Sequence, residues 1–327
     1  MMRDPNDNNH ALQPSTTQVL VLDWRPNEFT ETLERFPHVT FHVTTSLDEA
    51  RPHLDTADVL VTVGHDVTSQ VIGQMPALRW MHSLISGTNW ATAALEHRPD
   101  VLLTSTRGIH GQRMAEAALC HMLCLAREVP RSVRNQDRRR WERWDSVLLA
   151  GKTVAIVGMG VIGEQLARTC SALGMTVLGV SRTQRPVEGV ADIFARDELP
   201  LVAAQADFLV LTVPLSADTQ HLIDSRVLQA MKPTAYLVNL ARGAVIDTAA
   251  LLAALHDGTI AGAGLDVFDP EPLPADSPLW GLDNVFMTAH IGGRSDGYIA
   301  DAMLIFEPNL RLWLDGDHAS LLNPVER

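Results

Sequence analysis

Three ionisable side chains in the last third of the sequence each come shortly after a short apolar run typical of a buried strand. They are Arg242, Glu271 and His290, and the runs cover residues 236–240, 262–267 and 285–288. Parallel strands end together at one edge of a sheet, and open α/β sheets bind their ligands at that edge. We therefore expect the three side chains to lie at one site.

These residue types suit proton and hydride chemistry at a carbonyl group. An imidazole near neutral pH can protonate the carbonyl oxygen while hydride adds to the carbon. A carboxylate beside it would stabilise its protonated form, and a guanidinium would hold an anionic substrate and polarise its carbonyl. Each residue alone also suits an ordinary role: Arg242 in a surface ion pair, Glu271 in a solvated loop, His290 as a structural histidine. Three of them at consecutive strand ends, beside a cofactor loop, favour the catalytic interpretation.

The stretch 153–163 predicts a dinucleotide-binding loop. A strand-like run, 153–157, precedes glycines at 158, 160 and 163, which is the G-x-G-x-x-G spacing. Gly158 permits a tight turn, Gly160 lets a pyrophosphate approach the backbone, and Gly163 lets the next helix, about 161–173, lie close on the strand. A turn that uses its glycines only for packing is the alternative. The predicted cofactor contacts are Gly158, Met159, Gly160, Val161, Ile162 and Gly163, with Val213, Pro214 and Asp266 at other strand ends.

The residues after the next strand, 176–180, indicate which cofactor is used. NAD sites usually place a carboxylate there for the ribose hydroxyl, whereas NADP sites use arginine for the 2′-phosphate. This chain has Ser181, Arg182 and Thr183, with Arg185 just beyond. We therefore expect NADP(H) to be preferred, with NAD(H) as the alternative; Arg182 covering the adenine or facing solvent would be the ordinary interpretation.

Strands alternate with short helices along the whole chain, which predicts an α/β fold with parallel sheets. Five strand-like runs, beginning at residue 18 and ending at 104, form a first unit, and six more between 153 and 288 form the nucleotide unit. A helical pattern over 112–128 ends before Pro130, and another covers 297–316. We expect the last helix to return to the first unit, so that the two domains are interleaved.

Composition limits the function classes. The 327 residues allow two domains, and the formal net charge of −13 argues against general nucleic-acid binding. Three cysteines give no disulfide framework. The start of the sequence lacks the apolar segment of a signal peptide, and no apolar run is long enough for a membrane helix. We therefore expect a cytoplasmic protein with no membrane contact.

An arginine-rich segment follows Pro130 and contains Trp141 and Trp144. A solvated connecting helix is its ordinary interpretation. Exposed tryptophans beside arginines are, however, common at protein interfaces. We therefore hypothesise that this segment contributes to a homodimer.

Four motifs together resemble the D-isomer-specific 2-hydroxyacid dehydrogenase family. They are GKTVAIVGMGVIG at 151–163, VNLARGAVID at 238–247, GLDVFDPEPLP at 264–274, and PLW at 278–280 with TAHIGG at 288–293. The resemblance implies a catalytic set of Arg242, Glu271 and His290. It also implies a doubly wound NAD(P)-binding domain, 107–290, inserted in a flavodoxin-like substrate domain, 1–106 and 291–327, with a cleft between the domains that closes on the substrate. Backbone N–H groups of Ile85, Ser86 and Gly87 would then bind the substrate carboxylate, together with Arg242.

The chain departs from the family pattern in two places. Ala289 replaces the usual proline before the histidine, and Ser181 and Arg182 replace the frequent aspartate. The second departure resembles the NADP-using glyoxylate and hydroxypyruvate reductase branch. The expected activity is reduction of a small 2-keto acid to the D-2-hydroxy acid, with His290 as proton donor. A corepressor that binds dinucleotide and partner proteins on the same scaffold is the alternative.

Overall fold

The computed structural model describes residues 16–64 and 66–327. The chain divides into two compact units. Unit 1 is the N-terminal part up to Ile109 together with Asp296–Arg327, and unit 2 is His110–Ser295. The sequence placed the boundaries after 106 and after 290, so the division observed here falls three and five residues further on.

Unit 1 is built on a parallel sheet. Among its described residues this sheet has five strands in the order β2-β1-β3-β4-β5, which is the flavodoxin-like order. The registers are parallel throughout, for example Val19 beside both Phe41 and Val59. The strands are β1 (Gln18–Leu22), β2 (Thr40–Thr44), β3 (Val59–Thr62), β4 (Trp80–Ser83) and β5 (Leu102–Ser105).

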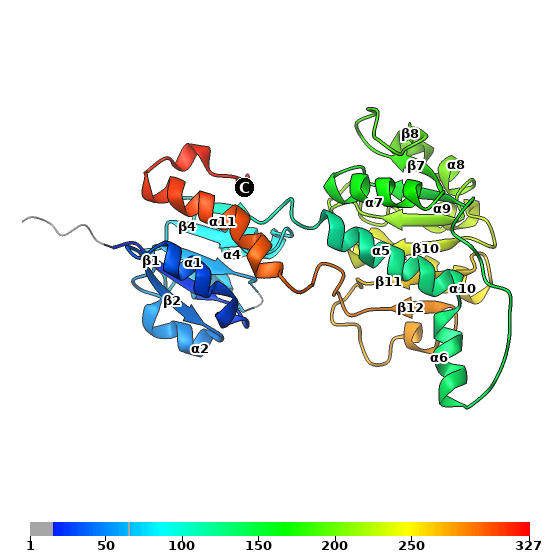
Figure 1. Cartoon of the computed structure of the whole chain (residues 1–327), viewed down its shortest axis with the longest axis horizontal. Coiled ribbons are helices and arrows are strands. Elements are labelled where there is room, and N and C mark those ends of the chain that lie inside the picture. Colours follow the sequence, from blue (N-terminus) through cyan, green and yellow to red (C-terminus); the bar gives the residue numbers. More distant parts are fainter. Residues whose placement is uncertain (1–15, 65) are drawn as a thin grey trace, which may run out of the picture. The chain divides into compact units, whose positions relative to one another are not determined.

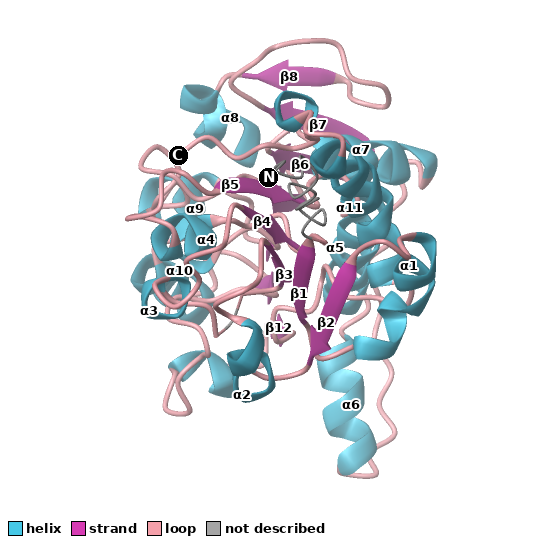
Figure 2. Ribbon diagram, turned by 90° about the vertical axis from the view of Figure 1, so that its left-hand side faces the viewer, coloured by secondary structure: helices cyan, strands magenta, loops and turns pink. Residues whose placement is uncertain are grey.

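Helices cover both faces of this sheet because its strands are apolar on both sides. Figure 2 shows α1 (Thr30–Arg35) and α11 (Tyr298–Leu314) on one side, and α2 (Leu47–Ala50), α3 (Ser69–Ile72) and α4 (Asn89–Ala94) on the other. Two buried clusters correspond to these faces; the cluster under α11 contains Trp80, which stacks on Phe306 and Trp313. The predicted return of the last helix to the first unit is what the structure has (Figure 1). Short 3-10 turns complete the unit at η1 (Pro26–Phe29), η2 (Arg51–His53) and η6 (His318–Ser320).

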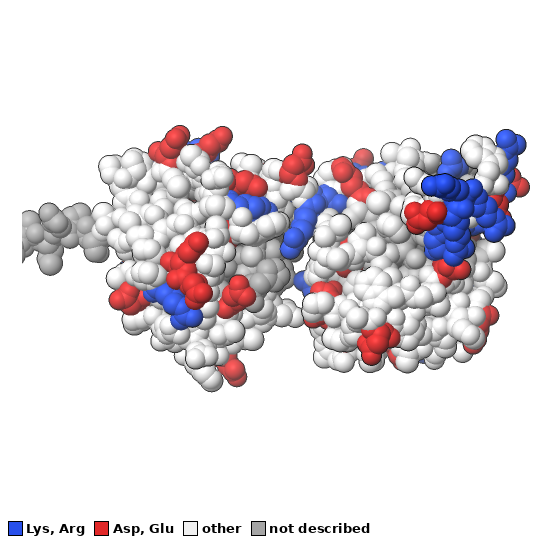
Figure 3. All heavy atoms as spheres, turned by 90° about the horizontal axis from the view of Figure 1, so that it is seen from below, with Lys and Arg blue, Asp and Glu red and all other residues white. Residues whose placement is uncertain are grey.

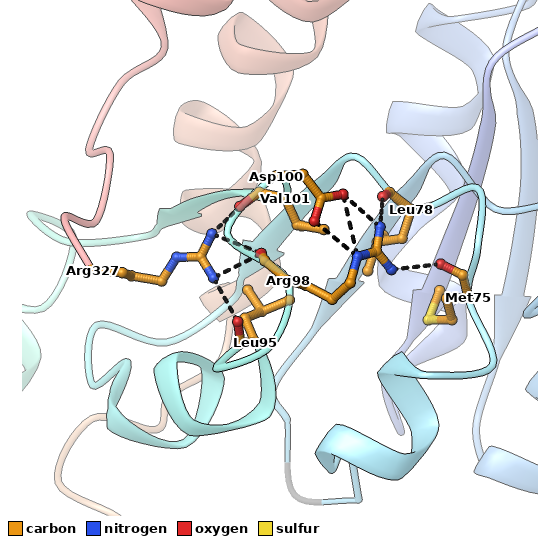
Figure 4. Close-up of polar contacts among 7 residues, drawn as sticks. All are labelled: Met75, Leu78, Leu95, Arg98, Asp100, Val101 and Arg327. Atoms are coloured by element: carbon orange, nitrogen blue, oxygen red, sulfur yellow. Dashed lines mark hydrogen bonds and ion pairs between the residues drawn. The ribbon is translucent and has the colours of Figure 1, made fainter.

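The edge strand β5 is covered by the end of the chain. Pro324 pairs with Thr104 in an antiparallel bridge, and the Val325 N–H donates to the Leu103 carbonyl at 2.9 Å. Two arginines form hydrogen bonds in and around the turn at residues 95–101, which precedes β5 (Figure 4). Arg98 donates to the carbonyls of Met75 and Leu78 and pairs with Asp100, while Arg327 donates to the carbonyls of Leu95, Arg98 and Val101. These side-chain bonds add to the backbone bonds of the turn, in which the carbonyls of Met75, Leu95 and Arg98 also accept N–H groups.

One buried histidine lies inside the unit 1 sheet. His82 on β4 is fully buried, and its Nδ1 lies 2.7 Å from the Thr104 hydroxyl. Burial lowers the pKa of His82 to about 3, so the ring is neutral at physiological pH.

Unit 2 contains a longer parallel sheet. Within residues 110–295, all of which the structure describes, it has seven strands in the order β12-β11-β10-β9-β6-β7-β8. The order reverses at β6, which is the switch point of a doubly wound dinucleotide-binding fold. The strands are β6 (Thr153–Val157), β7 (Thr176–Val180), β8 (Asp192–Phe194), β9 (Phe208–Leu211), β10 (Tyr236–Asn239), β11 (Gly262–Leu265) and β12 (Val285–Met287). The sequence predicted six of them; β8, only three residues long, was missed.

Two helical layers enclose the unit 2 sheet. α5 (Gly111–Ala126) and α7 (Val161–Ala172) lie side by side on one face (Figure 1), with a buried cluster beneath them. The opposite face carries α8 (Leu199–Ala203), α9 (Ser225–Ala230) and α10 (Thr248–His256). The 3-10 turns are η3 (Arg196–Glu198), η4 (Gly243–Val245) and η5 (Pro278–Gly281).

The arginine-rich segment differs from its prediction. Pro130 does not simply end a helix: it lies in the first turn of α6 (Val129–Asp137), where a missing N–H costs nothing. The break falls just before it, at Glu128, whose φ is 51°. Residues 138–149 form no helix, and basic side chains gather over this part of unit 2 (Figure 3). Trp141 is 88% exposed, but Trp144 is half-buried beneath the Arg131 guanidinium.

Two findings bear on the other sequence expectations. No helix within 16–64 or 66–327 has the length and apolar character needed to cross a membrane. All three cysteines, Cys120, Cys124 and Cys170, are free thiols.

Candidate active site

Arg242 is placed by a turn that follows β10. The Asn239 side chain spans this turn: its Oδ1 accepts from the Ala241 N–H at 3.0 Å, and its Nδ2 donates to the Arg242 carbonyl at 2.9 Å. The Arg242 guanidinium donates to the Ala241 carbonyl at 2.7 Å. The buried amide of Asn239 therefore fixes the backbone from which Arg242 projects.

The next residue, Gly243, packs directly on the loop that carries Glu271. A β-carbon at 243 would overlap the backbone of Phe268 and Asp269. Only glycine permits this approach. The close packing holds Arg242 beside the 268–271 loop, near enough for its charge to act on Glu271.

Glu271 and His290 form a hydrogen-bonded pair. The Nδ1 of His290 lies 2.8 Å from Glu271 Oε2, and the other carboxylate oxygen accepts from the Phe268 N–H at 2.8 Å. Partial burial works to raise the pKa of Glu271, but the bonds from His290 and Phe268 and the charges of His290 and Arg242 outweigh it. The pKa of Glu271 therefore lies below its ordinary value, which keeps the carboxylate ionised beside the imidazole.

His290 has an unusual backbone, with φ at 52° in the left-handed region. Asp266 secures the loop around it. The Asp266 carbonyl accepts from the His290 N–H at 2.8 Å, and its carboxylate accepts from the N–H groups of Ile291 and Gly292, both at 2.9 Å. Asp266 is 1% exposed. Both of its carboxylate oxygens are therefore engaged with this loop. Contact between Asp266 and a cofactor stays a prediction.

Asp266 has another partner that the sequence did not single out. The Thr288 hydroxyl donates to Asp266 Oδ1 at 2.5 Å, and it also meets His121 from α5. Thr288 ends the strand-like run 285–288, so the sequence indicated that it lies at a strand end near the histidine. Nothing in the sequence indicated that its other partner would be His121, on a helix far away in the chain.

The glycine loop has the geometry expected of a phosphate-binding turn. Gly158 has a φ of 109°, and a β-carbon on Gly163 would overlap the Gly158 carbonyl, so the helix packs tightly on the strand. A β-carbon on Gly160 would meet nothing within 4 Å. Space is therefore open above the Gly160 backbone, at the N-terminus of α7, where a pyrophosphate would fit.

The other predicted cofactor residues divide into two groups. Met159 is buried and its side chain packs on Gly179, while Val213 is buried against Gly158, so both can offer mainly backbone to a ligand. The outward-facing residues are Val161, Pro214, Arg182 and Thr183, with Ile162 and Ser181 partly exposed.

The segment after β7 is held at two points. The Ser181 N–H donates to the Phe194 carbonyl of β8 at 3.0 Å, and the Ser181 hydroxyl accepts from the Thr183 N–H at 3.3 Å. Arg185 forms an ion pair with Glu164 in the first turn of α7. Arg182 is exposed between these anchors, at a strand end beside the glycine loop's helix.

Ile85, Ser86 and Gly87 belong to unit 1, where they follow β4. The Ser83 hydroxyl donates to the Ile85 carbonyl at 2.9 Å and accepts from the Ile85 N–H at 3.3 Å. Ser86 is exposed. In the part of the chain that the structure describes, no group of three or more His, Cys, Asp or Glu side chains could hold a metal ion.

A doubly wound domain with an open glycine loop and neighbouring Arg, Glu and His side chains defines a dinucleotide-dependent oxidoreductase. Residues 119–292 match the family model described as D-isomer specific 2-hydroxyacid dehydrogenase, NAD binding domain. The glyoxylate reductase of Thermococcus onnurineus is 37% identical over 253 residues, covering 73% of this chain and 75% of that protein. The chain therefore belongs to the D-isomer-specific 2-hydroxyacid dehydrogenase family, an NAD(P)-dependent class of enzyme.

Solved structures agree with this assignment. A D-isomer specific 2-hydroxyacid dehydrogenase family protein from Aeromonas salmonicida has a TM-score of 0.87 and 32% identity, covering 95% of this chain and 99% of that one. An NADPH-dependent glyoxylate/hydroxypyruvate reductase from Sinorhizobium meliloti, solved with NADP and sulfate, has a TM-score of 0.81 and 26% identity, covering 95% and 98%. The family resemblance and the α/β fold class expected from the sequence are thus confirmed.

Proposed function

We propose that this protein reduces a small 2-keto acid of the glyoxylate or hydroxypyruvate type to the D-2-hydroxy acid. The observation that carries the proposal is the 2.8 Å pairing of His290 with Glu271, in the same unit as the glycine loop. The names of the Thermococcus and Sinorhizobium relatives support this substrate class.

The chain's own residues supply binding and proton transfer. His290 Nδ1 faces Glu271, which leaves Nε2 as the atom that gives its proton to the substrate's carbonyl oxygen. Glu271 holds the protonated ring in place. Arg242 binds the substrate carboxylate and polarises the carbonyl. The backbone N–H groups of Ile85, Ser86 and Gly87 add further donors for that carboxylate. When bound, the reduced dinucleotide supplies the hydride that the carbonyl carbon accepts.

We also propose that NADPH is preferred over NADH. The loop 158–163 would hold the pyrophosphate, and Arg182, with Ser181 and Thr183, would meet the 2′-phosphate. The absence of a carboxylate at 181–183 supports this choice, since an acidic residue there would repel that phosphate. The Sinorhizobium reductase, solved with NADP, supports it as well.

A homodimer is proposed through the segment around Trp141. Exposed apolar side chains gather along α5, α6 and the segment after it: Leu123, Val133, Trp141 and Leu148 are 45%, 51%, 88% and 65% exposed. Such a set is typical of an interface. Sedimentation of Trp141→Ala is the direct test, and an unchanged dimer would contradict the assignment. Trp144 is the poorer target because it supports Arg131 within the subunit.

The decisive experiment for the proposed function is a panel of 2-keto acids assayed with NADPH and with NADH. We expect turnover of glyoxylate or hydroxypyruvate, with higher kcat/KM for NADPH. Dinucleotide binding without turnover of any keto acid would contradict the enzyme assignment, and higher efficiency with NADH would contradict the cofactor choice.

A further inference from the structure

The catalytic histidine adopts a backbone conformation that its neighbours must enforce. A non-glycine residue with φ near 52° is costly and persists only where the surroundings fix it. The N–H groups of His290, Ile291 and Gly292 all donate to Asp266, the first to its carbonyl and the others to its carboxylate. Asp266 therefore determines the course of the loop that carries the imidazole.

The orientation of the Asp266 carboxylate is in turn set by Thr288. The two groups are 2.5 Å apart, and the Thr288 hydroxyl donates to Asp266 Oδ1. A hydroxyl has one proton. Thr288 can then only accept from its other partner, His121 Nε2, at 3.0 Å. His121 is thus the donor, which fixes the tautomer with the proton on Nε2.

The His121 side chain is buried against the unit 2 sheet. It is 2% exposed, its ring lies edge-on to Phe286 of β12 with centroids 4.9 Å apart, and a β-carbon on Gly264 of β11 would come within 2.9 Å of its Nδ1. Among the described residues, His121 Nδ1 has no hydrogen-bond partner. Burying an unpaired polar atom is unfavourable, and an apolar residue of similar size would avoid that cost. Within the part of the chain that the structure describes, the hydrogen bond to Thr288 is the polar contact that a histidine provides here and a phenylalanine would not.

We propose that His121 and Thr288 are positioning residues, which hold Asp266 and through it keep the His290 imidazole at its place beside Glu271. This inference rests on the proposed function only in taking His290 as the proton donor. The bonds run from α5, through the end of β12, to the end of β11, so three elements of unit 2 converge on the catalytic loop.

The test compares variants that remove the bonds with variants that keep them. Thr288→Val and His121→Phe preserve shape and remove the hydroxyl or the donor. Thr288→Ser and His121→Gln retain them, the Gln Nε2 standing in for the imidazole Nε2. Thr169→Val is the matched control, because the Thr169 hydroxyl also bonds within unit 2, to the Gln165 carbonyl at 2.8 Å, but away from the loop.

Three quantities are measured: kcat, the Kd for NADPH without keto acid, and hydrogen exchange of the peptide containing 288–292. We expect Thr288→Val to lower kcat by about 10- to 100-fold, as a displaced catalytic group does, with the Kd for NADPH changed less than about threefold. His121→Phe should lower kcat by roughly tenfold. Both should speed exchange of Ile291 and Gly292, and Thr288→Ser and His121→Gln should restore most of each effect.

Two outcomes would overturn the inference: wild-type kcat and loop exchange in Thr288→Val and His121→Phe, or equal losses in the conservative variants. Because exchange is read without turnover, it is independent of the reaction. If His290→Ala keeps full activity while loop exchange responds as predicted, the proton-donor role fails and the positioning network stands.

Discussion

The Nδ1 of His290 lies 2.8 Å from the Oε2 of Glu271, and the other oxygen of that carboxylate is bound by the Phe268 N–H. The pair joins the segment after β11 to the segment after β12. It fixes Nδ1 of the imidazole toward Glu271, so Nε2 is the nitrogen proposed to face the substrate, and it places a carboxylate beside the ring.

Replacing Glu271 with glutamine removes this charge while leaving a group of the same shape. We expect kcat for keto-acid reduction to fall by about 10- to 100-fold, because a neutral amide stabilises the protonated imidazole less. The Kd for NADPH should stay near the wild-type value. A Glu271→Gln enzyme with unchanged kcat would show that the negative charge of Glu271 does not contribute to catalysis.

The lowered pKa of Glu271 gives a pH dependence with a definite sign. Because its pKa is lower in the folded state than the ordinary value of 4.5, the carboxylate stabilises the fold above that value and loses this contribution as pH falls through the folded pKa. The unfolding free energies of wild type and Glu271→Gln should therefore differ most above pH 4.5 and converge in more acid solution. Urea titrations across that window measure it; a difference that grows on acidification would contradict the assignment.

Gly243 offers a steric test of how Arg242 is positioned. Its β-carbon would overlap the Phe268 and Asp269 backbone, which cannot move aside as a flexible side chain can. We expect Gly243→Ala to lower the free energy of unfolding by about 1–3 kcal/mol and to reduce kcat. Gly160→Ala is the matched variant, since its β-carbon enters open space: it should keep wild-type stability but bind dinucleotide more weakly.

Arg182 provides the test of cofactor choice. Arg182→Ala should lower kcat/KM for NADPH by about 10- to 100-fold, the value of a charge-assisted hydrogen bond, and leave kcat/KM for NADH nearly unchanged. Equal losses with both cofactors would mean that Arg182 contacts a part of the dinucleotide common to both.

The buried histidine of unit 1 predicts a loss of stability in mild acid. His82 has a folded pKa of about 3 against an ordinary value of 6.5, so between these values the unfolded chain binds a proton that the folded chain does not. Stability must therefore fall as pH drops below 6.5, by about 1.4 kcal/mol per pH unit for this group. His82→Asn retains an atom near the Thr104 hydroxyl and cannot titrate. Urea unfolding at pH 7 and pH 5 should show about 2 kcal/mol less acid loss in the variant; equal acid loss would contradict the prediction.

The meeting of Arg242, Glu271 and His290 and the geometry of the glycine loop could be predicted, because turn residues and strand ends are local features of a sequence; the catalytic role of the three residues stays a prediction. Glu271 and His290 each follow a recognisable strand, and their pairing required only that neighbouring parallel strands end together. The network behind them could not be predicted, since His121 and Thr288 are 167 residues apart and neither stands at a motif position that demands a partner.

The misplaced elements have equally physical causes. β8 has three residues, too few for a periodic pattern, and is recognisable only by its pairing with β7. Pro130 was interpreted as a helix breaker, although a proline is also compatible with the first turn of a helix, and the structure uses it there. Trp144 was expected to be exposed, but the ring lies under Arg131, whose guanidinium centre is 4.5 Å from it.

The central claim is that His290 protonates the substrate, and His290→Ala in single-turnover reduction of glyoxylate by bound NADPH tests it most directly. If His290 has this role, the Kd for NADPH is unchanged and the rate falls by about 10²- to 10⁴-fold. A rate close to that of the wild-type enzyme would contradict it.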